Sequence, residues 1–301
     1  MAQGFASVKK IITNVRYIML TIGWTYNNND MTLSNRGVKM KILVCIKPVE
    51  DPEKRAGGSD FYSKDTRMNR FDEYALEEAL QIREAMGKST VDVLSLGPND
   101  VDQLLKRAMG MGADRGIHLL AEENPFPDPY SSAFLMAEYA RDKGYDLILT
   151  GVMSEDLMQA QVGPMIGEML SMDCATAVIA TRISSDFKTV SVEREIEGGA
   201  REGWELTLPA LLTIQSGINR PRYPILSQML RASRQKLEVI KGESIGSPLA
   251  RQVVTHTAIP EKQRQGLTLH GSSREKAEAL MTIFREKGFL KDARNQSPSC
   301  L

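Results

Sequence analysis

Short apolar runs alternate with amphipathic stretches along residues 40–181. Apolar runs bounded by turn residues are typical of buried parallel strands, and apolar positions three and four residues apart are typical of helices. Strands are expected at 41–46, 91–97, 116–120, 146–151 and 174–181. Helices are expected at 71–86 (with Asn69 as its N-cap), 100–112, 131–143 and 159–170. This alternation predicts an α/β fold, a doubly wound, mostly parallel sheet with helices on both faces.

Sheets of this kind bind ligands beyond the carboxyl ends of their strands, which directs attention to the loops at 47–71, 96–100 and 151–163. The first is long and irregular, as functional loops often are. The third runs into a helix N-terminus, whose free N–H groups favour a phosphate. The chain has no GxGxxG or GxxxxGK[ST] motif, so topology alone indicates a nucleotide. The alternative is that Gly97, Gly151 and Gly163 only serve turns and caps.

Residues 188–214 join a charged run to an apolar one. We expect two strands across a Gly-Gly turn, with the second ending as buried sheet at 208–214. Glu193, Glu195 and Glu197 alternate along the first strand and share one face, so a solvated hairpin explains them better than acid–base machinery. The sequence offers no Ser/His/Asp set or paired-carboxylate loop, and no catalytic residue is expected.

Composition narrows the class of protein. The 38 basic and 38 acidic residues form no long run of either sign, which argues against nucleic-acid binding. No stretch reaches the ~18 apolar residues that indicate a membrane span, so no insertion into a membrane is expected. Cys45, Cys174 and Cys300 are far apart and odd in number, which favours a reducing compartment, and no metal site is expected.

The ends of the chain differ from the rest. Residues 1–39 hold five basic residues against one acid, Asp30, a composition that also suits a transit peptide. We favour an upstream extension that contributes nothing to the fold, because Met40 opens directly into a strand. That interpretation predicts a cytoplasmic, bacterial protein, and a transit peptide would instead predict the mitochondrial matrix. Residues 292–301 are expected to be a disordered tail.

The stretch VEREIEGGAREGWELTLPALLTI (192–214) resembles the signature of electron transfer flavoprotein beta subunits. The matching positions are Arg194, Glu197, Gly198, Gly199, Glu202, Pro209 and Thr213. Trp204 stands where the family usually has an aliphatic residue. Further segments such as MNRFDEYALEEAL, RAMGMGADRGIHL and NRPRYP follow in the family's order, so the resemblance covers about residues 40–290.

The resemblance implies a nucleotide-binding fold of the adenine nucleotide alpha hydrolase-like type, with a β-hairpin extension and a C-terminal helical arm. Residues 40–220 would form the nucleotide-binding domain and 221–241 a partner recognition loop and helix. Residues 242–291 would form an arm that contacts an alpha subunit, chiefly through the apolar stripe of the last helix (272–290).

The resemblance also implies an electron carrier subunit rather than an enzyme. Such proteins are heterodimers that take electrons from acyl-CoA-type dehydrogenases of fatty acid β-oxidation and pass them to a quinone-linked oxidoreductase. The alpha subunit holds most of the FAD, and the beta subunit binds AMP and lines the flavin. Some relatives carry a second FAD in place of AMP and split electron pairs. The sequence AQVGP (160–164) also occurs in those relatives, so a second FAD is kept as the alternative to AMP, which is preferred.

The implied cofactor-binding residues lie in the three loops already chosen by the sheet topology. They are Cys45, Asn69, Arg70, Phe71, Asp72, Leu96, Gly151, Asp156, Gln159, Ala160, Gln161, Val162 and Gly163. Phe71 would also approach the flavin ring, whereas Pro52 replaces the family's aromatic residue in its loop. Met158, Ala160 and Val162 replace frequent polar residues, so phosphate contacts are expected from backbone N–H groups.

Leu226 is the implied docking residue for the dehydrogenase, an exposed anchor ringed by Arg231, Arg234 and Lys236. From the residues alone, the alternative is an ordinary amphipathic helix with Ile225, Leu226, Met229 and Leu230 packed inward.

Two other functions stay open. A stand-alone nucleotide-binding regulatory module would be a monomer without flavin. A hydrolase or transferase on the same sheet is least supported, because the sequence shows no nucleophile–base pair.

Overall fold

The computed structural model describes residues 40–50, 66–87, 89–121, 128–253, 255 and 266–290. The predicted extension at 1–39, Pro52 and the predicted tail at 292–301 lie outside the described residues. The chain divides into two compact units, Met1–Val253 and Val254–Leu301, which are described separately.

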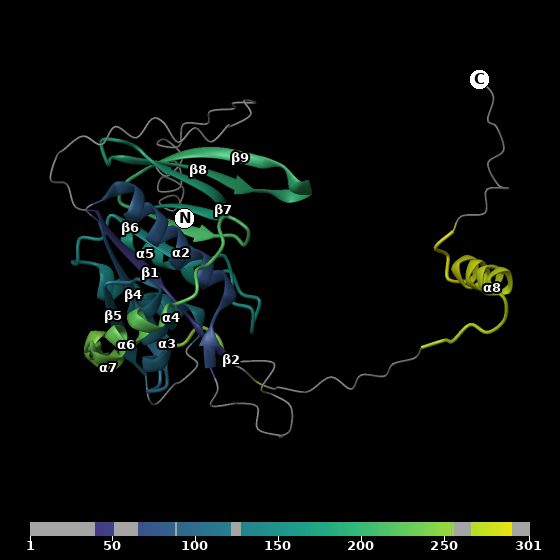
Figure 1. Cartoon of the computed structure of the whole chain (residues 1–301), viewed down its shortest axis with the longest axis horizontal. Coiled ribbons are helices and arrows are strands. Elements are labelled where there is room, and N and C mark those ends of the chain that lie inside the picture. The colour runs from purple at the N-terminus through teal and green to yellow at the C-terminus, as the bar shows by residue number, and fades with distance from the viewer. Residues whose placement is uncertain are drawn as a thin grey trace, which may run out of the picture. The chain divides into compact units, whose positions relative to one another are not determined.

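The first unit is built on a nine-stranded sheet with the order β11-β5-β4-β1-β6-β10-β7-β8-β9 (Figure 1). Its parallel part comprises β1 (Lys41–Cys45), β4 (Thr90–Gly97), β5 (Arg115–Leu120), β6 (Leu147–Gly151), β7 (Asp173–Ile183), β10 (Ala210–Ile214) and β11 (Glu238–Lys241). The central strands are almost continuously buried, as expected where helices cover both faces. The predicted mostly parallel α/β sheet is confirmed.

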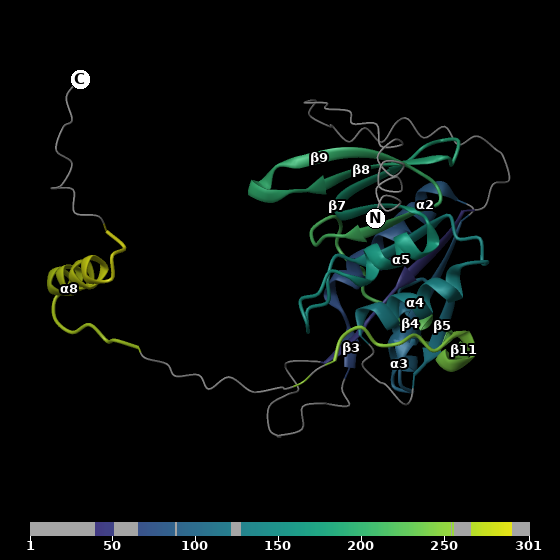
Figure 2. The same ribbon diagram turned by 180° about the vertical axis from the view of Figure 1, so that it is seen from behind.

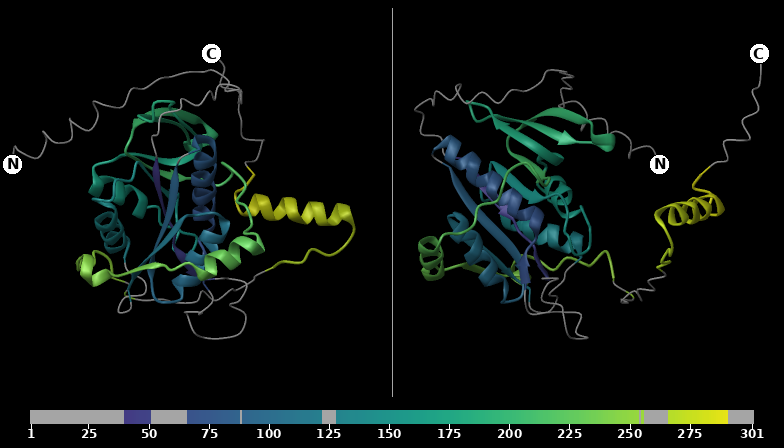
Figure 3. Two further views of the ribbon diagram at one scale, coloured as in Figure 1. Left: turned by 60° about the vertical axis from the view of Figure 1, so that its left-hand side comes forward. Right: turned by 45° about the vertical axis from the view of Figure 1, so that its right-hand side comes forward.

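Four helices cover the sheet and divide the core into two layers. They are α2 (Arg70–Met86), α3 (Val101–Met111), α4 (Pro129–Ala140) and α5 (Val162–Leu170). Residues of α2 and α3 pack with Ile42 and Val44, whereas those of α4 and α5 pack with Leu43 and Cys45. This follows from the two-residue period of a strand, whose successive side chains point to opposite faces. In the left view of Figure 3, α2 (blue) and the α4–α5 layer (teal) lie on opposite sides of the sheet.

The charged and apolar runs at 188–214 form three strands instead of the expected two. β8 (Thr189–Glu195) and β9 (Arg201–Thr207) pair antiparallel, and β8 also pairs antiparallel with β7. The turn between them, Glu197–Gly199, uses Gly198 and Gly199 at positive φ (74° and 75°), as predicted for the Gly-Gly pair. After Leu208 and Pro209 the chain leaves this edge, and β10 lies parallel between β6 and β7. The prediction that one strand runs from the Gly-Gly turn to residue 214 is therefore wrong. Figure 2 shows the β8–β9 hairpin from behind.

Several elements remain, of which the helices at 226–234 and 273–286 lie within the segments predicted at 221–241 and 272–290, and the others were not predicted. β2 (Pro48–Glu50) and β3 (Thr66–Met68) form a separate antiparallel pair. In the C-terminal part of the first unit, α6 (Leu226–Arg234) precedes β11, and α7 (Gly242–Ile245) follows it. Within the described residues of the second unit, α8 (Ser273–Glu286) begins at a capping box made by Ser272 and Glu275. No helix in the described part of the chain is long and apolar enough to cross a membrane.

Candidate functional site

The three loops chosen from the sequence follow adjacent strands. β4, β1 and β6 are neighbours at the centre of the sheet, and Leu96, Cys45 and Gly151 lie at their carboxyl ends. Cys45 and Leu96 are buried in the core layer of α4 and α5. Burial also raises the pKa of the Cys45 thiol far above its ordinary value, with a smaller contribution from Asp72. This thiol therefore stays neutral and contributes apolar surface.

Asp72 joins two of the loops. Its Oδ2 accepts a hydrogen bond from the Lys47 backbone N–H (2.7 Å), and its Oδ1 accepts one from Gly151 N–H (2.9 Å). The residue is only 4% exposed. Burial raises the pKa of Asp72 to about 7, although the hydrogen bonds from Lys47, Asn69 and Gly151 lower it. A single carboxyl group therefore fixes the exit of β1 against the end of β6.

Asn69 lies at the predicted N-cap of α2, but its side chain does not cap the helix. Its Nδ2 donates to the Met153 carbonyl oxygen (2.9 Å), and its Oδ1 accepts from Glu155 N–H (3.2 Å). The predicted side-chain cap is wrong because these backbone groups of the 151–163 loop take both ends of the amide. At the start of α2, Arg70 N–H donates to the Glu155 carboxylate (3.1 Å) instead.

Two ion pairs fasten the same loops together. Lys47 Nζ lies 2.7 Å from Asp156, and Arg67 lies 2.8 Å from Glu155. Burial raises the pKa of Asp156, but the hydrogen bonds and charge of Lys47 outweigh it and hold the pKa below its ordinary value. Sequence reasoning missed Lys47 and Glu155. The signals were a basic residue directly after a buried strand and an acid beside Asp156.

Close packing explains why positions 151 and 163 are occupied by glycine. A Cβ at Gly151 would lie 2.4 Å from Asp72 Oδ1 and 2.6 Å from Phe71 Cβ. A Cβ at Gly163 would lie 2.7 Å from both Thr150 Oγ1 and Thr213 Cγ2. These glycines allow α2 and α5 to approach the strand ends, which goes beyond a role in turns and caps.

The remaining predicted residues continue the loop into α5. Gln159 accepts a hydrogen bond from Ser154 N–H through its backbone carbonyl (3.1 Å), and Ala160 is exposed. Val162 packs against the core layer of α4 and α5. Gln161 precedes α5, and its side-chain oxygen lies 3.5 Å from the Gln252 amide nitrogen. These four residues lie along the path into α5, and the contacts around Asp72 come from the first half of the loop.

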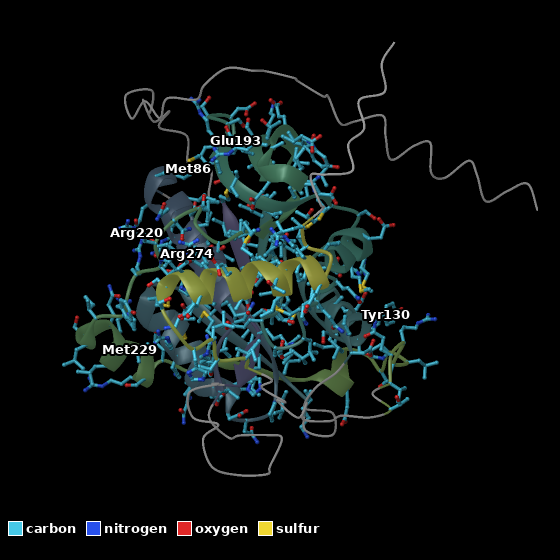
Figure 4. The ribbon with its side chains drawn as sticks, turned by 90° about the vertical axis from the view of Figure 1, so that its right-hand side faces the viewer. Met86, Tyr130, Glu193, Arg220, Met229 and Arg274 are labelled. Atoms are coloured by element: carbon cyan, nitrogen blue, oxygen red, sulfur yellow. The ribbon has the colours of Figure 1, made fainter. Side chains whose placement is uncertain are left out.

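Residues 251 and 252 also lie near the candidate site, which the sequence did not suggest. Arg251 N–H donates to the Asp128 carboxylate (3.3 Å), and its guanidinium lies 4.9 Å from the centre of the Tyr130 ring. Figure 4 labels Tyr130, which lies in the first turn of α4. The chain after α7 therefore passes the N-termini of both α4 and α5.

Signature residues connect the hairpin to the sheet. The Arg194 guanidinium stacks 4.5 Å from the centre of the Trp204 ring and donates to Thr176 Oγ1 (2.9 Å). Thr213 Oγ1 accepts from Ala177 N–H (3.1 Å). Glu195 and Glu197 are exposed, as the solvated hairpin predicts, whereas Glu193 is half-buried and pairs with Arg201 at 3.6 Å.

The apolar residues of α6 mostly face solvent. Ile225, Leu226 and Leu230 are 57%, 76% and 54% exposed. Met229 and Ala232 face inward instead, towards α3. The alternative in which all four apolar residues pack inward is therefore wrong for three of them. We call Ile225, Leu226 and Leu230, with the exposed Arg231, Arg234 and Lys236, the α6 face.

Comparison with known proteins adds to this geometry. Residues 62–243 match the electron transfer flavoprotein domain. The chain is 30% identical over 259 residues to the electron transfer flavoprotein subunit beta of Bacillus subtilis (strain 168), an alignment that covers 82% of this chain and 98% of the relative. It is 34% identical over 223 residues to the subunit of the same name from Sus scrofa, which covers 73% of this chain and 85% of the relative. The chain therefore belongs to the electron transfer flavoprotein family and is related to its beta subunits.

Proposed function

We propose that this chain is the beta subunit of a heterodimeric electron transfer flavoprotein. It carries no catalytic residue of its own, binds AMP at the three-loop site, and lines an FAD held mainly by an alpha subunit. The complex takes electrons from acyl-CoA-type dehydrogenases and passes them to a quinone-linked oxidoreductase. The observation that carries the proposal is the pair of hydrogen bonds by which Asp72 joins two of the loops at the centre of the sheet, in a chain related to beta subunits.

The residues at this edge fit an adenine nucleotide. Cys45 and Leu96 offer buried apolar surface for a base, and the start of α5 offers backbone N–H groups for a phosphate. Lys47 balances the charge of Asp156, which reduces the repulsion that this carboxylate would exert on a phosphate. Ala160 and Val162 have no polar side-chain atoms, so the N–H groups carry this contact.

A second FAD in place of AMP is the other candidate. Leu157 and Met158 are exposed at the tip of the 151–163 loop, and Met158 has a positive φ of 53°. Apolar side chains held at such a tip suit the larger flat surface of a flavin better than they suit AMP.

The two candidates predict different cofactor contents. The chain is co-expressed with its alpha subunit, the purified complex is denatured, and released FAD and AMP are separated and quantified. One FAD and one AMP per heterodimer supports the carrier with a structural nucleotide, and two FAD without AMP supports the second candidate. A stable monomer that binds AMP reversibly and never co-purifies with flavin contradicts both, and it supports a regulatory module instead.

The outer surfaces supply the proposed partner contacts. The α6 face joins an apolar anchor, Leu226, to a basic rim, which suits a transient partner with an acidic rim. In the second unit, Leu280, Met281 and Phe284 of α8 are each partly exposed and form the stripe proposed to contact the alpha subunit.

A further inference from the structure

The α6 face is presented by a short helix that cannot hold its own position. α6 has nine residues, and helices of that length are marginal in water without tertiary packing. Only Ala232 within it is fully buried. The orientation of α6 therefore depends on the residues that contact its inward side. These residues belong mainly to the stretch RAMGMGADRG (107–116), together with Lys106.

Gly110 is the first contact. It lies near the end of α3, and a Cβ at this position would lie 2.3 Å from Met229 Sδ, 3.2 Å from Met229 Cγ and 3.3 Å from Pro224 Cβ. Glycine inside a helix costs about 1 kcal/mol relative to alanine. Because Gly110 has no side chain, Pro224, which precedes α6, and Met229, on the inward side of α6, can pack against its backbone. Figure 4 labels Met229 on α6, far from Glu193 on β8.

Gly116 is the second contact, on the exit side of the helix. A Cβ on this residue of β5 would lie 2.6 Å from Leu237 Cδ2, and Leu237 lies between α6 and β11. The chain on both sides of α6 is thus packed against a glycine of the same ten-residue stretch.

Lys106 provides the polar contact. Its Nζ donates to the carbonyl oxygens of Ala232 (3.0 Å) and Gln235 at the end of α6. The last carbonyl groups of a helix lack partners within it and carry partial negative charge, so an ammonium group there stabilises the end. α3 therefore holds both the middle and the end of α6.

We propose that Gly110, Gly116 and Lys106 are positioning residues for partner docking. They hold α6 at one orientation so that Leu226 and its basic rim meet an acyl-CoA-type dehydrogenase whose docking surface is an apolar pocket ringed by carboxylates. This inference rests on the proposed function and extends it to residues that touch neither the partner nor a cofactor.

Gly110→Ala tests the inference in the complete heterodimer. The substitution pushes Met229 outward and tilts α6, so the KM of a purified acyl-CoA dehydrogenase for the carrier rises about as much as with Leu226→Ala. The kcat and the FAD released per heterodimer stay unchanged. Adding Met229→Ala to Gly110→Ala removes the two nearest clashing atoms and returns the KM towards its starting value.

Lys106→Met provides a second test that does not require a new side chain to fit. It removes the ammonium donor from both carbonyl groups, so Ala232 keeps only the bond from Gln235 N–H (3.2 Å), and amide hydrogen exchange in α6 becomes at least tenfold faster. Lys188→Met is the matched control, because Lys188 is exposed in the turn between β7 and β8.

The outcomes separate the two claims. If Leu226→Ala raises the KM while Gly110→Ala and Lys106→Met change neither the KM nor hydrogen exchange, the positioning role is overturned and the docking face stands. If Leu226→Ala leaves the KM unchanged, docking through the α6 face fails, and the positioning role fails with it.

Discussion

Gly151 lies where the first turn of α2 packs against the end of β6. An added Cβ would meet the Phe71 backbone carbon at 2.8 Å as well as the Asp72 carboxylate, and backbone atoms cannot rotate away as a side chain does. The size of this one residue therefore decides whether Asp72 can reach both Lys47 and Gly151.

Replacing Gly151 with alanine is expected to lower the free energy of unfolding by about 1–3 kcal/mol, the usual cost of overpacking. Urea denaturation of the heterodimer measures this loss, and quantification of released nucleotide is expected to show a lower AMP content. Gly203→Ala is the control, because a Cβ there meets nothing within 4 Å. Equal losses in the two variants would show that the close packing at Gly151 does not matter.

The raised pKa of Asp72 predicts a pH dependence of stability. The pKa rises from its ordinary value of 3.8 to about 7 on burial, so the folded chain keeps a proton that the unfolded chain releases. The contribution of Asp72 to stability is therefore complete below about pH 4 and decreases as the pH rises towards 7.

Urea denaturation at several pH values compares Asp72→Asn with Asp142→Asn, a change at an exposed carboxylate. Asp72→Asn is expected to remove this part of the pH dependence and to lower stability by about 1–3 kcal/mol at low pH, because an amide cannot accept both N–H bonds. An unchanged pH profile in Asp72→Asn would show that this group does not titrate between folded and unfolded chains.

The sequence could predict which residues lie at the candidate site but not all of the contacts that they make there. Asn69 and Asp72 were located by the resemblance and by the sheet topology. That Asn69 serves the 151–163 loop instead of α2 depends on a contact 84 residues away, which no local pattern reveals. Lys47 and Glu155 were missed for the same reason, since their partners are distant in sequence.

At the scale of elements, α2 connects the candidate site to α6. Its first turn carries Asp72, and its later turns carry Glu77 and Glu84, which bind Arg222 just before α6. Arg222 Nε lies 2.8 Å from Glu77, and Arg222 Nη1 lies 2.6 Å from Glu84. Glu77 is only 3% exposed, so it needs this partner.

Arg222→Met is expected to lower the free energy of unfolding by about 3 kcal/mol, because it leaves the Glu77 carboxylate buried without a cation. Arg220→Met is the matched control at an exposed position two residues away (Figure 4). Comparable destabilisation in both variants would contradict a specific role for the Glu77–Arg222 pair.

The same pair predicts how stability changes in acid. Burial raises the pKa of Glu77, but hydrogen bonds from Arg222 outweigh it, and they also lower the pKa of Glu84. The stabilisation is therefore present above the ordinary value of 4.5 and is lost as the pH falls below it. Denaturation curves between pH 3 and 6 are expected to show a smaller loss in Arg222→Met than in the unchanged chain.

Periodicity predicted the parallel strands and their helices well, because buried runs and amphipathic stretches are local signals. It failed at Leu208 and Pro209, where two short strands with different partners look like one long apolar run. It also failed for α6, since its exposed leucines have the spacing of an inward-facing helix, and only the fold shows which side meets α3.

For the first unit as a whole, the two proposed functions lie on different parts of one sheet. The candidate nucleotide site follows the central strands β4, β1 and β6, whereas the proposed docking helix α6 packs on α3, which in turn packs on β5 and β4. The β8–β9 hairpin forms the opposite edge (Figure 1). This separation predicts that variants of the α6 face change partner affinity without changing bound nucleotide.

The most direct test of the carrier function is anaerobic reduction of the flavin in the purified heterodimer. A catalytic amount of acyl-CoA dehydrogenase and an excess of its acyl-CoA substrate are added, and flavin absorbance is followed. Full bleaching that requires both the dehydrogenase and the acyl-CoA is the predicted result. A heterodimer whose flavin stays oxidised with several such dehydrogenases, or is reduced by acyl-CoA alone, would contradict the carrier function.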